Sequence, residues 1–260
     1  MARAGATMKF EAARMPHAQV DPVLARHALK RALCATFRLF ARHGFNEGVA
    51  GHVTARDPVD RDCFWVNPFG APYALMRPDR LSCLRRDGTL LEGAPVNAAA
   101  FAIHAAIHQS RPEIDCVAHG HPLYGKAWST LGRLLAPVDH DVCTISEDHV
   151  IYARPTGLVT GAAEAMRIAQ ALGSRKAIIL PNHGILTVGR RIEEAAWWFF
   201  LMERSCQVQI LSRTAGGPNT LISPEDARAI CAATGTPEFG WFQAQPIFEV
   251  IYADNPDLRE

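Results

Sequence analysis

Two short, largely apolar segments, residues 114–119 and 176–180, each lead into histidines, and this pairing constrains the fold more than any other feature of the chain. Both are too short for typical helices and are bounded by turn residues, so they are predicted as buried strands. The first leads into His119 and His121, separated by one glycine. Residues i and i+2 of a strand project from the same face, so these two imidazoles can reach one point, and Gly120 should leave the opposite face open. If the second strand lies near the first, His183 can complete a set of three.

The rest of the chain is predicted to form short strands in some segments and helices in others. Residues 47–93 hold short β-rich runs between Gly, Pro and Asp, and residues 136–152 are expected to be irregular. Asp21 is a plausible N-cap, and Ser223 with Asp226 a plausible capping box. Apolar residues at helical spacing predict helices over residues 22–43, 97–109, 125–135, 161–172, 192–213 and 223–234. This pattern indicates one α/β domain over residues 21–260, with helices covering a central sheet, and a disordered lead over residues 1–20.

Three histidines leave coordination positions open, which a catalytic metal site needs and a closed structural zinc site lacks. The expected cofactor is one divalent ion per subunit, with Zn, Mn or Fe all acceptable to imidazole ligands. A His-x-His pair also arises by chance in a chain with 11 histidines, so spacing alone leaves an incidental pair open.

Charge and composition exclude several other classes of function. The chain has 27 Lys+Arg and 26 Asp+Glu, and its basic residues are scattered, which argues against a nucleic-acid or anionic-membrane partner. No run of eighteen apolar residues is present, so no membrane span is predicted. Seven cysteines without a Cys-x-x-Cys spacing indicate reduced core thiols and a cytoplasmic location.

Four motifs resemble the class II aldolase/adducin family. Residues 111–122 (RPEIDCVAHGHP) are similar to its first metal motif, and residues 179–187 (ILPNHGILT) to the motif with the third ligand. Residues 51–56 (GHVTAR) and 67–70 (NPFG) resemble its two early substrate-side loops. The likeness runs from about residue 21 to 215.

The resemblance implies a three-layer α/β/α fold around a mainly antiparallel sheet, and a homotetramer with active sites between subunits. It also implies that His119, His121 and His183 hold the metal. The family includes adducin-type interaction modules without activity, but this chain keeps all three ligand positions.

Departures from the family pattern limit which substrates and proton donors are expected. Sugar-phosphate aldolases of the family carry Ser-Ser-Glu where this chain has Ala98-Ala99-Ala100, so the phosphate hydroxyls and the proton-shuttling carboxylate are missing. His52 stands where these aldolases often have a phosphate-binding Asn, and His140 where they have a proton-donating Tyr. A phosphorylated sugar is therefore not the expected substrate. His140, from a neighbouring subunit, and His52 are the candidate proton donors, although His140 can equally be a surface residue.

The favoured activity is carbon–carbon lyase chemistry on a small carboxylate, most simply decarboxylation of a hydroxyaryl or related hydroxy or keto acid, as in this family's hydroxyaryl-carboxylate decarboxylases. One alternative is a non-haem Fe(II) oxygenase that cleaves a hydroxyphenylpyruvate-type side chain, as in the family's aminocoumarin prenylphenylpyruvate oxygenases; another is an aldolase acting on an unphosphorylated hydroxy-keto acid. The candidate substrate-binding residues are Asn97, Phe69, Gly70 and Tyr124, with Tyr73 as a further aromatic candidate. His104 and His108, at i and i+4 of a predicted helix, are interpreted as hydrogen-bonding residues behind the site or in the core.

Overall fold

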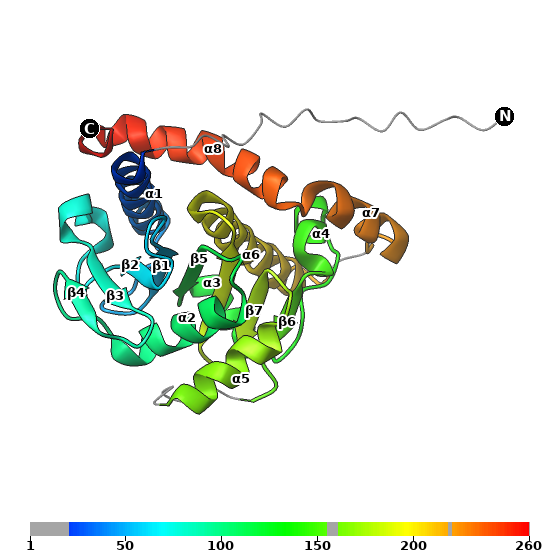
Figure 1. Cartoon of the computed structure of the whole chain (residues 1–260). Coiled ribbons are helices and arrows are strands. Elements are labelled where there is room, and N and C mark those ends of the chain that lie inside the picture. The colour runs from blue at the N-terminus through cyan, green and yellow to red at the C-terminus, as the bar shows by residue number, and fades with distance from the viewer. Residues whose placement is uncertain (1–20, 155–160, 218–219, 260) are drawn as a thin grey trace.

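An eight-stranded sheet lies at the centre of the computed structural model, which describes residues 21–154, 161–217 and 220–259 (Figure 1). The strand order is β4-β3-β2-β1-β5-β8-β7-β6. The strands are β1 (His52–Arg56), β2 (Cys63–Val66), β3 (Ser82–Arg85), β4 (Leu90–Glu92), β5 (Cys116–Gly120), β6 (His149–Ile151), β7 (Ala177–Leu180) and β8 (Gly184–Gly189).

Neighbouring strands of the sheet are antiparallel except for β6 and β7, which pair in parallel. The prediction of a mainly antiparallel sheet is therefore confirmed. The two strands predicted from their apolar runs correspond to β5 and β7, and β8 lies between them and pairs with both. The segments that carry His119, His121 and His183 are thus held within one sheet.

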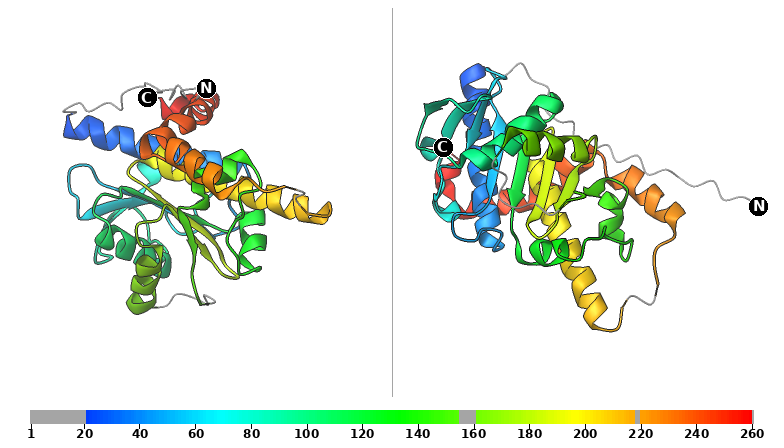
Figure 2. Two further views of the ribbon diagram at one scale, coloured as in Figure 1. Left: turned by 90° about the vertical axis from the view of Figure 1, so that its right-hand side faces the viewer. Right: turned by 90° about the horizontal axis from the view of Figure 1, so that it is seen from below.

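Helices cover both faces of the sheet (Figure 2). Helices α2 and α5 pack on one face over a core that includes Val117, Ile178 and Leu186. On the other face, α1, α3, α4, α6 and α8 surround the larger core. The predicted three-layer α/β/α architecture is confirmed. The helices are α1 (Pro22–Arg42), α2 (Ala98–Ser110), α3 (Leu123–Ser129), α4 (His140–Ser146), α5 (Ala162–Leu172), α6 (Ile192–Thr214), α7 (Pro224–Thr234) and α8 (Pro237–Asp254).

Side-chain caps explain where several helices begin. The Asp21 carboxylate accepts hydrogen bonds from the backbone N–H groups of Val23 and Leu24, and proline stands at the first position of α1. Ser223 caps α7 by accepting from the Asp226 N–H, which confirms the predicted cap. Asn97 caps α2 in the same way, so this element starts at Ala98.

Three predictions of local structure differ from what the structure shows. Helix α3 begins and ends earlier than the predicted 125–135 range, and Gly132, with a positive φ of 60°, lies beyond its end, in a conformation that a helix does not adopt. The segment expected to be irregular contains α4 and β6. Helix α8 was not predicted, since Pro246 lies inside it and a proline ordinarily ends a helix.

Two further predictions concern the chain as a whole. All seven cysteines are free thiols, and six of them are buried, as expected for reduced core residues. Among the described residues, no helix combines the length and the apolar character needed to cross a bilayer. The disordered lead predicted for residues 1–20 lies outside the described residues.

Candidate metal centre

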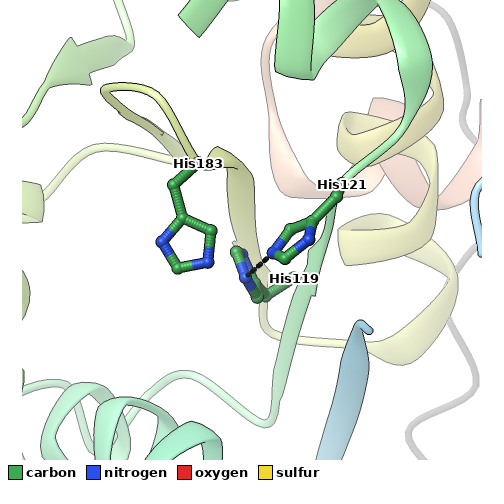
Figure 3. A group of neighbouring side chains, drawn as sticks. All are labelled: His119, His121 and His183. Atoms are coloured by element: carbon green, nitrogen blue, oxygen red, sulfur yellow. Dashed lines mark hydrogen bonds between the residues drawn. The ribbon is translucent and has the colours of Figure 1, made fainter. Parts of the chain in front are cut away.

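Strand β5 positions the first two histidines. It runs through the middle of the sheet between β1 and β8, so His119 is almost fully buried. His121 follows the strand directly and projects to the same side (Figure 3). The opposite side of Gly120 is filled, because a Cβ there would lie 3.1 Å from the Phe199 ring of α6. The expectation that this face is open was therefore wrong: glycine is needed for close packing.

A tight turn between β7 and β8 positions the third histidine. The His183 N–H donates to the Leu180 carbonyl over 3.0 Å, which closes a four-residue turn. Pro181 occupies its second position, where φ must be negative, and Asn182 its third, with φ of +58°. This combination is typical of a type II turn, which requires a residue that tolerates the left-handed region. At Gly184, a Cβ would lie 2.4 Å from the Gly120 carbonyl, so the two ligand-bearing segments meet in backbone contact.

The three imidazoles converge on one point (Figure 3). Each offers one ring nitrogen, and these nitrogens lie within 4.8 Å of one another. The Nε2 atoms of His119 and His121 are 3.2 Å apart. Two nitrogens that each lie about 2.1 Å from one tetrahedral ion are roughly 3.4 Å apart, so the spacing suits ligation of a single ion.

Hydrogen bonding and burial also suit the three rings to metal ligation. His119 Nδ1 donates to the Ile185 carbonyl over 2.9 Å, which leaves the Nε2 lone pair free for an ion. Burial lowers the pKa of His119 well below its usual value, lowers that of His121, and lowers that of His183 to about 4. All three are therefore neutral at neutral pH, the protonation state that metal ligation requires. This donor set fits Zn, Fe or Mn with positions left for other ligands.

The three rings open onto a cavity of about 420 Å³. His52 also lines this cavity. Strand β1 pairs with β5 so that His52 is the cross-strand partner of His119, and the centroids of their rings are 5.0 Å apart. Among the residues that the structure describes, the lining includes no carboxylate, lysine, arginine or hydroxyl side chain. It consists of Val49, Ala50, Gly51, His52, Phe69, Asn97, Ala99, Ala100, Ile103, His119, His121, Asn182 and His183.

The predicted substrate-binding residues divide into two groups. Phe69 and Asn97 line the cavity, and Gly70, with φ of +77°, follows Phe69 in the same loop. The Asn97 side-chain oxygen accepts from the Ala100 N–H, so its amide N–H groups remain for a ligand. Tyr124 lies outside the lining, half-buried against the larger core. Tyr73 is likewise buried in that core, where its ring packs edge-on against Phe37.

His140 lies away from the cavity of its own chain. It is the first residue of α4, its side chain is 68% exposed, and its nearest ionic neighbour is Asp141 at 3.9 Å. Within one copy of the chain it does not line the cavity with His119. Its predicted role therefore depends on a second copy of the chain.

Sequence reasoning missed one residue that supports the centre. The Glu203 carboxylate, buried on α6, accepts hydrogen bonds from the backbone N–H groups of Tyr124 (3.0 Å) and Gly125 (2.5 Å). These groups belong to the first turn of α3, three and four residues after His121, so Glu203 anchors the segment that follows this ligand position. No motif marks this carboxylate in the sequence, because the contact joins residues far apart in the chain.

A larger cavity, of about 590 Å³, lies between α2, α5 and the β3–β4 turn. Its lining is mainly alanine and other apolar residues together with Arg86 and Asp87, and in the described part of the chain it includes no histidine or cysteine. The histidine-lined cavity is therefore the better candidate for chemistry, although it is the smaller of the two.

His104 and His108 form hydrogen bonds in the core, as interpreted from the sequence. Both rings contact the Thr54 hydroxyl, and both residues are at most 2% exposed. Burial lowers the pKa of His108 to about 3 and lowers that of His104 well below its usual value.

These depressed pKa values predict a loss of stability in acid. The unfolded chain takes up a proton at His108 near pH 6.5, whereas the folded chain does so only near pH 3, so stability falls as pH drops through this window. This one residue should account for roughly 4 kcal/mol by pH 3.5. Urea unfolding of the metal-free protein from pH 7 to pH 5 measures the slope. His108→Phe, which keeps a ring against Phe64, should reduce the slope by the contribution of about one proton, because other buried histidines still contribute, and an unchanged slope would contradict the assignment.

Comparison with known proteins places these features in one family. Residues 31–210 match the family model for the Class II Aldolase and Adducin N-terminal domain. The chain is 41% identical to the 4-hydroxy-3-prenylphenylpyruvate oxygenase/4-hydroxy-3-prenylbenzoate synthase of Streptomyces roseochromogenus subsp. oscitans, over 93% of this chain and 89% of that protein. It is also 41% identical to Decarboxylase NovR of Streptomyces niveus, over 90% of this chain and 87% of that protein.

A solved structure with the same fold carries a different name. The L-fuculose 1-phosphate aldolase from Glaciozyma antarctica PI12 superposes with a TM-score of 0.87 and 39% identity. The match covers 94% of this chain and 96% of that one. Relatives of similar identity thus bear names for decarboxylation, oxygenation and aldol chemistry.

Proposed function

Because this chain belongs to the class II aldolase and adducin family, we propose that it is a divalent-metal-dependent carbon–carbon lyase. Its proposed reaction is decarboxylation of a hydroxyaryl carboxylate or a related hydroxy or keto acid. The relative named as a decarboxylase supports this choice.

The observation that carries the proposal is the make-up of the cavity. Three neutral imidazoles converge there, and Ala99 and Ala100 occupy the wall where sugar-phosphate aldolases of the family have a serine and a glutamate. Without a carboxylate base in the lining, substrates that need deprotonation at carbon are poorly served. A hydroxyaryl carboxylate needs no such base, because its own ring accepts the electrons as carbon dioxide leaves.

His119, His121 and His183 would hold the metal ion, which, when bound, would stabilise negative charge on substrate oxygens. The chain's other residues would orient the substrate. The exposed ring of Phe69 can pack on an aromatic face, and the Asn97 amide can donate to a carboxylate or hydroxyl oxygen.

Proton return to carbon is assigned to His140 of a neighbouring copy in a homotetramer, with His52 as the second candidate. The exposed position of His140 suits a residue that completes a partner's cavity. Burial lowers the pKa of His52 well below its usual value, so at neutral pH it can donate only after taking up a proton, for instance from the substrate's hydroxyl.

A second candidate function is oxygenation. It is favoured by the 41% identical relative named as a prenylphenylpyruvate oxygenase. Three neutral imidazoles can hold Fe(II), although the better-known oxygenase site has two histidines and one carboxylate.

Metal content and oxygen dependence test the proposal. The purified chain, loaded separately with Zn, Mn or Fe(II), is assayed without oxygen on a panel of hydroxybenzoates and hydroxyphenyl keto acids. We expect release of carbon dioxide under these conditions and, in heavy water, one deuterium at the vacated carbon. Strict dependence on dioxygen, consumed in step with product, would instead establish the oxygenase.

The same preparations test substrate class. Fuculose 1-phosphate should not be cleaved, because Ala98–Ala100 provide neither hydroxyl nor carboxylate groups. Robust cleavage would place this chain with the aldolase of the solved structure and remove the decarboxylase proposal.

A further inference from the structure

Helix α3 links the two segments that carry His121 and His183. Its first residue lies two positions after His121. At its other end, the Ser129 carbonyl oxygen accepts a hydrogen bond from the Asn182 N–H over 3.2 Å, and Asn182 directly precedes His183. The position of this seven-residue helix therefore bears on two of the three proposed ligands.

The same helix packs against the residue that orients the third ligand. A Cβ at Gly125 would lie 3.2 Å from two side-chain carbon atoms of Ile185, so α3 and β8 are in close contact here. The Ile185 carbonyl oxygen accepts from His119 Nδ1 over 2.9 Å. A shift of α3 would therefore change how the three imidazoles are placed relative to one another.

The Glu203 carboxylate fixes the start of this helix. It is 3% exposed, and its two oxygens accept from the backbone N–H groups of Tyr124 and Gly125. N–H groups in the first turn of a helix have no partner within the helix, and Pro122, the residue before α3, provides no side-chain cap. A carboxylate has two acceptor oxygens and no donor, so Glu203 satisfies both N–H groups at once.

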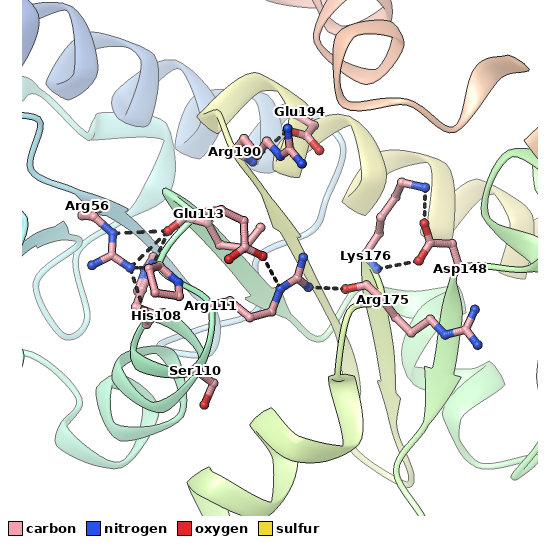
Figure 4. Close-up of polar contacts among 12 residues, drawn as sticks. Arg56, His108, Ser110, Arg111, Glu113, Asp148, Arg175, Lys176, Arg190 and Glu194 are labelled. Carbon is pink, nitrogen blue, oxygen red and sulfur yellow. Dashed lines mark hydrogen bonds and ion pairs between the residues drawn. The ribbon is translucent and has the colours of Figure 1, made fainter. Parts of the chain in front are cut away.

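A second buried glutamate of α6 has similar contacts away from the ligands. Glu194 is also 3% exposed, and it accepts from the Arg190 N–H over 2.7 Å (Figure 4) and from the Trp198 indole N–H over 3.1 Å. Arg190 follows the end of β8, whereas His183 precedes its start, so these contacts lie at the opposite end of the strand. Comparison of the two glutamates separates loss of stability from loss of ligand placement.

We propose that Glu203 is a positioning residue of the metal centre. By holding α3, it sets the separation of the His121 and His183 imidazoles, and hence the affinity and coordination geometry of the ion. Glu203 lies outside the cavity lining, so it acts through the helix and not by contact with the ion or the substrate. The inference rests on the proposed metal centre and is independent of the reaction that the cavity supports.

Titration of the full-length, metal-free chain with Co(II) tests the proposal, because Co(II) accepts imidazole ligands and its visible absorption spectrum reports coordination geometry. Competition with a chelator gives the affinity. Glu203→Gln retains the shape of the side chain, but its one oxygen satisfies only one N–H and its NH2 group faces the other. We expect Co(II) affinity to fall about 10- to 100-fold, the usual cost of losing a group that holds a ligand in place, together with a changed spectrum.

Glu194→Gln is the matched control. It should lose stability to urea to a similar extent but keep the native Co(II) affinity and spectrum. Native affinity and spectrum in Glu203→Gln would overturn the proposal. An equal loss of affinity in Glu194→Gln would also overturn it, because the loss would then follow stability and not ligand placement.

Gly125→Ala decides the question if Glu203→Gln does not fold. The added methyl group would lie 3.1 Å from Glu203 Oε2, so it should displace the carboxylate from the helix and weaken Co(II) binding, and native affinity would contradict the inference. A native chain that binds no Co(II) would remove the metal centre itself, and this inference with it. Co(II) binding without decarboxylation would remove only the proposed reaction.

Discussion

Replacement of His183 with alanine should remove most of the bound metal and abolish turnover. Structural zinc sites with four protein ligands contribute about 10–16 kcal/mol, or about 2.5–4 kcal/mol per ligand, so loss of one imidazole should weaken binding about 10²- to 10³-fold. The fold should persist, because the turn that carries His183 is closed by its backbone N–H and not by its ring. Metal analysis after gel filtration, with circular dichroism as a check on folding, measures both effects.

His27 provides a matched control for this prediction. It is an exposed histidine on α1, far in sequence from the three ligands, and His27→Ala should keep full metal content and activity. His119→Ala and His121→Ala should behave like His183→Ala. Stoichiometric metal in His183→Ala would remove this residue from the ligand set, even if activity were lost.

His140→Ala should slow decarboxylation by about 10²- to 10⁴-fold with unchanged metal content, the usual cost of removing a general acid. Its exposed position predicts little effect on stability.

The proposed location of His140 in a neighbour's cavity makes a second, sharper prediction. Co-expression of His140→Ala with His183→Ala should restore activity, because some mixed sites combine an intact metal cavity from one copy with an intact His140 from another. Random mixing should yield roughly a quarter of native sites.

His52 offers the control for this complementation. It lies beside His119 in the same chain, so co-expression of His52→Ala with His183→Ala should give no more activity than the average of the two variants alone. Absence of recovery with His140→Ala would show that His140 does not act across subunits. A fully active His140→Ala enzyme would leave the lyase proposal standing and make His52 the next candidate for the acid.

Much of the fold was predictable because local signals agreed with the tertiary structure. Asp21 before a proline marked the start of α1, and the short apolar runs marked β5 and β7. Helix α8 was not predicted because the proline inside it is a local signal against a helix. In the folded chain, packing of Phe248 and Ile251 against the core outweighs this signal.

The arrangement of the three histidines was predictable where backbone periodicity decides geometry. The spacing of His119 and His121 predicted that both imidazoles project from one side of the sheet, and the place of His183 just after the second predicted strand predicted that it could join them. Glu203 was missed because its contact with the start of α3 arises from helix packing between distant segments. The proposed role of His140 depends on another copy of the chain, which no pattern within one sequence can place.

The arrangement of β5 between β1 and β8 has a consequence for the order of events during folding. His121 and His183 are 62 positions apart in the sequence, and they meet only when β8 docks on β5. Such a pairing closes a long loop and is expected to form late, after the local helices. A metal ion that needs all three imidazoles would therefore bind the native chain and not its precursors, which slows unfolding but leaves the folding rate unchanged. In a cell short of the metal, the chain would fold at the usual rate. It would be degraded sooner, because the metal-free chain unfolds more often and is then open to proteolysis.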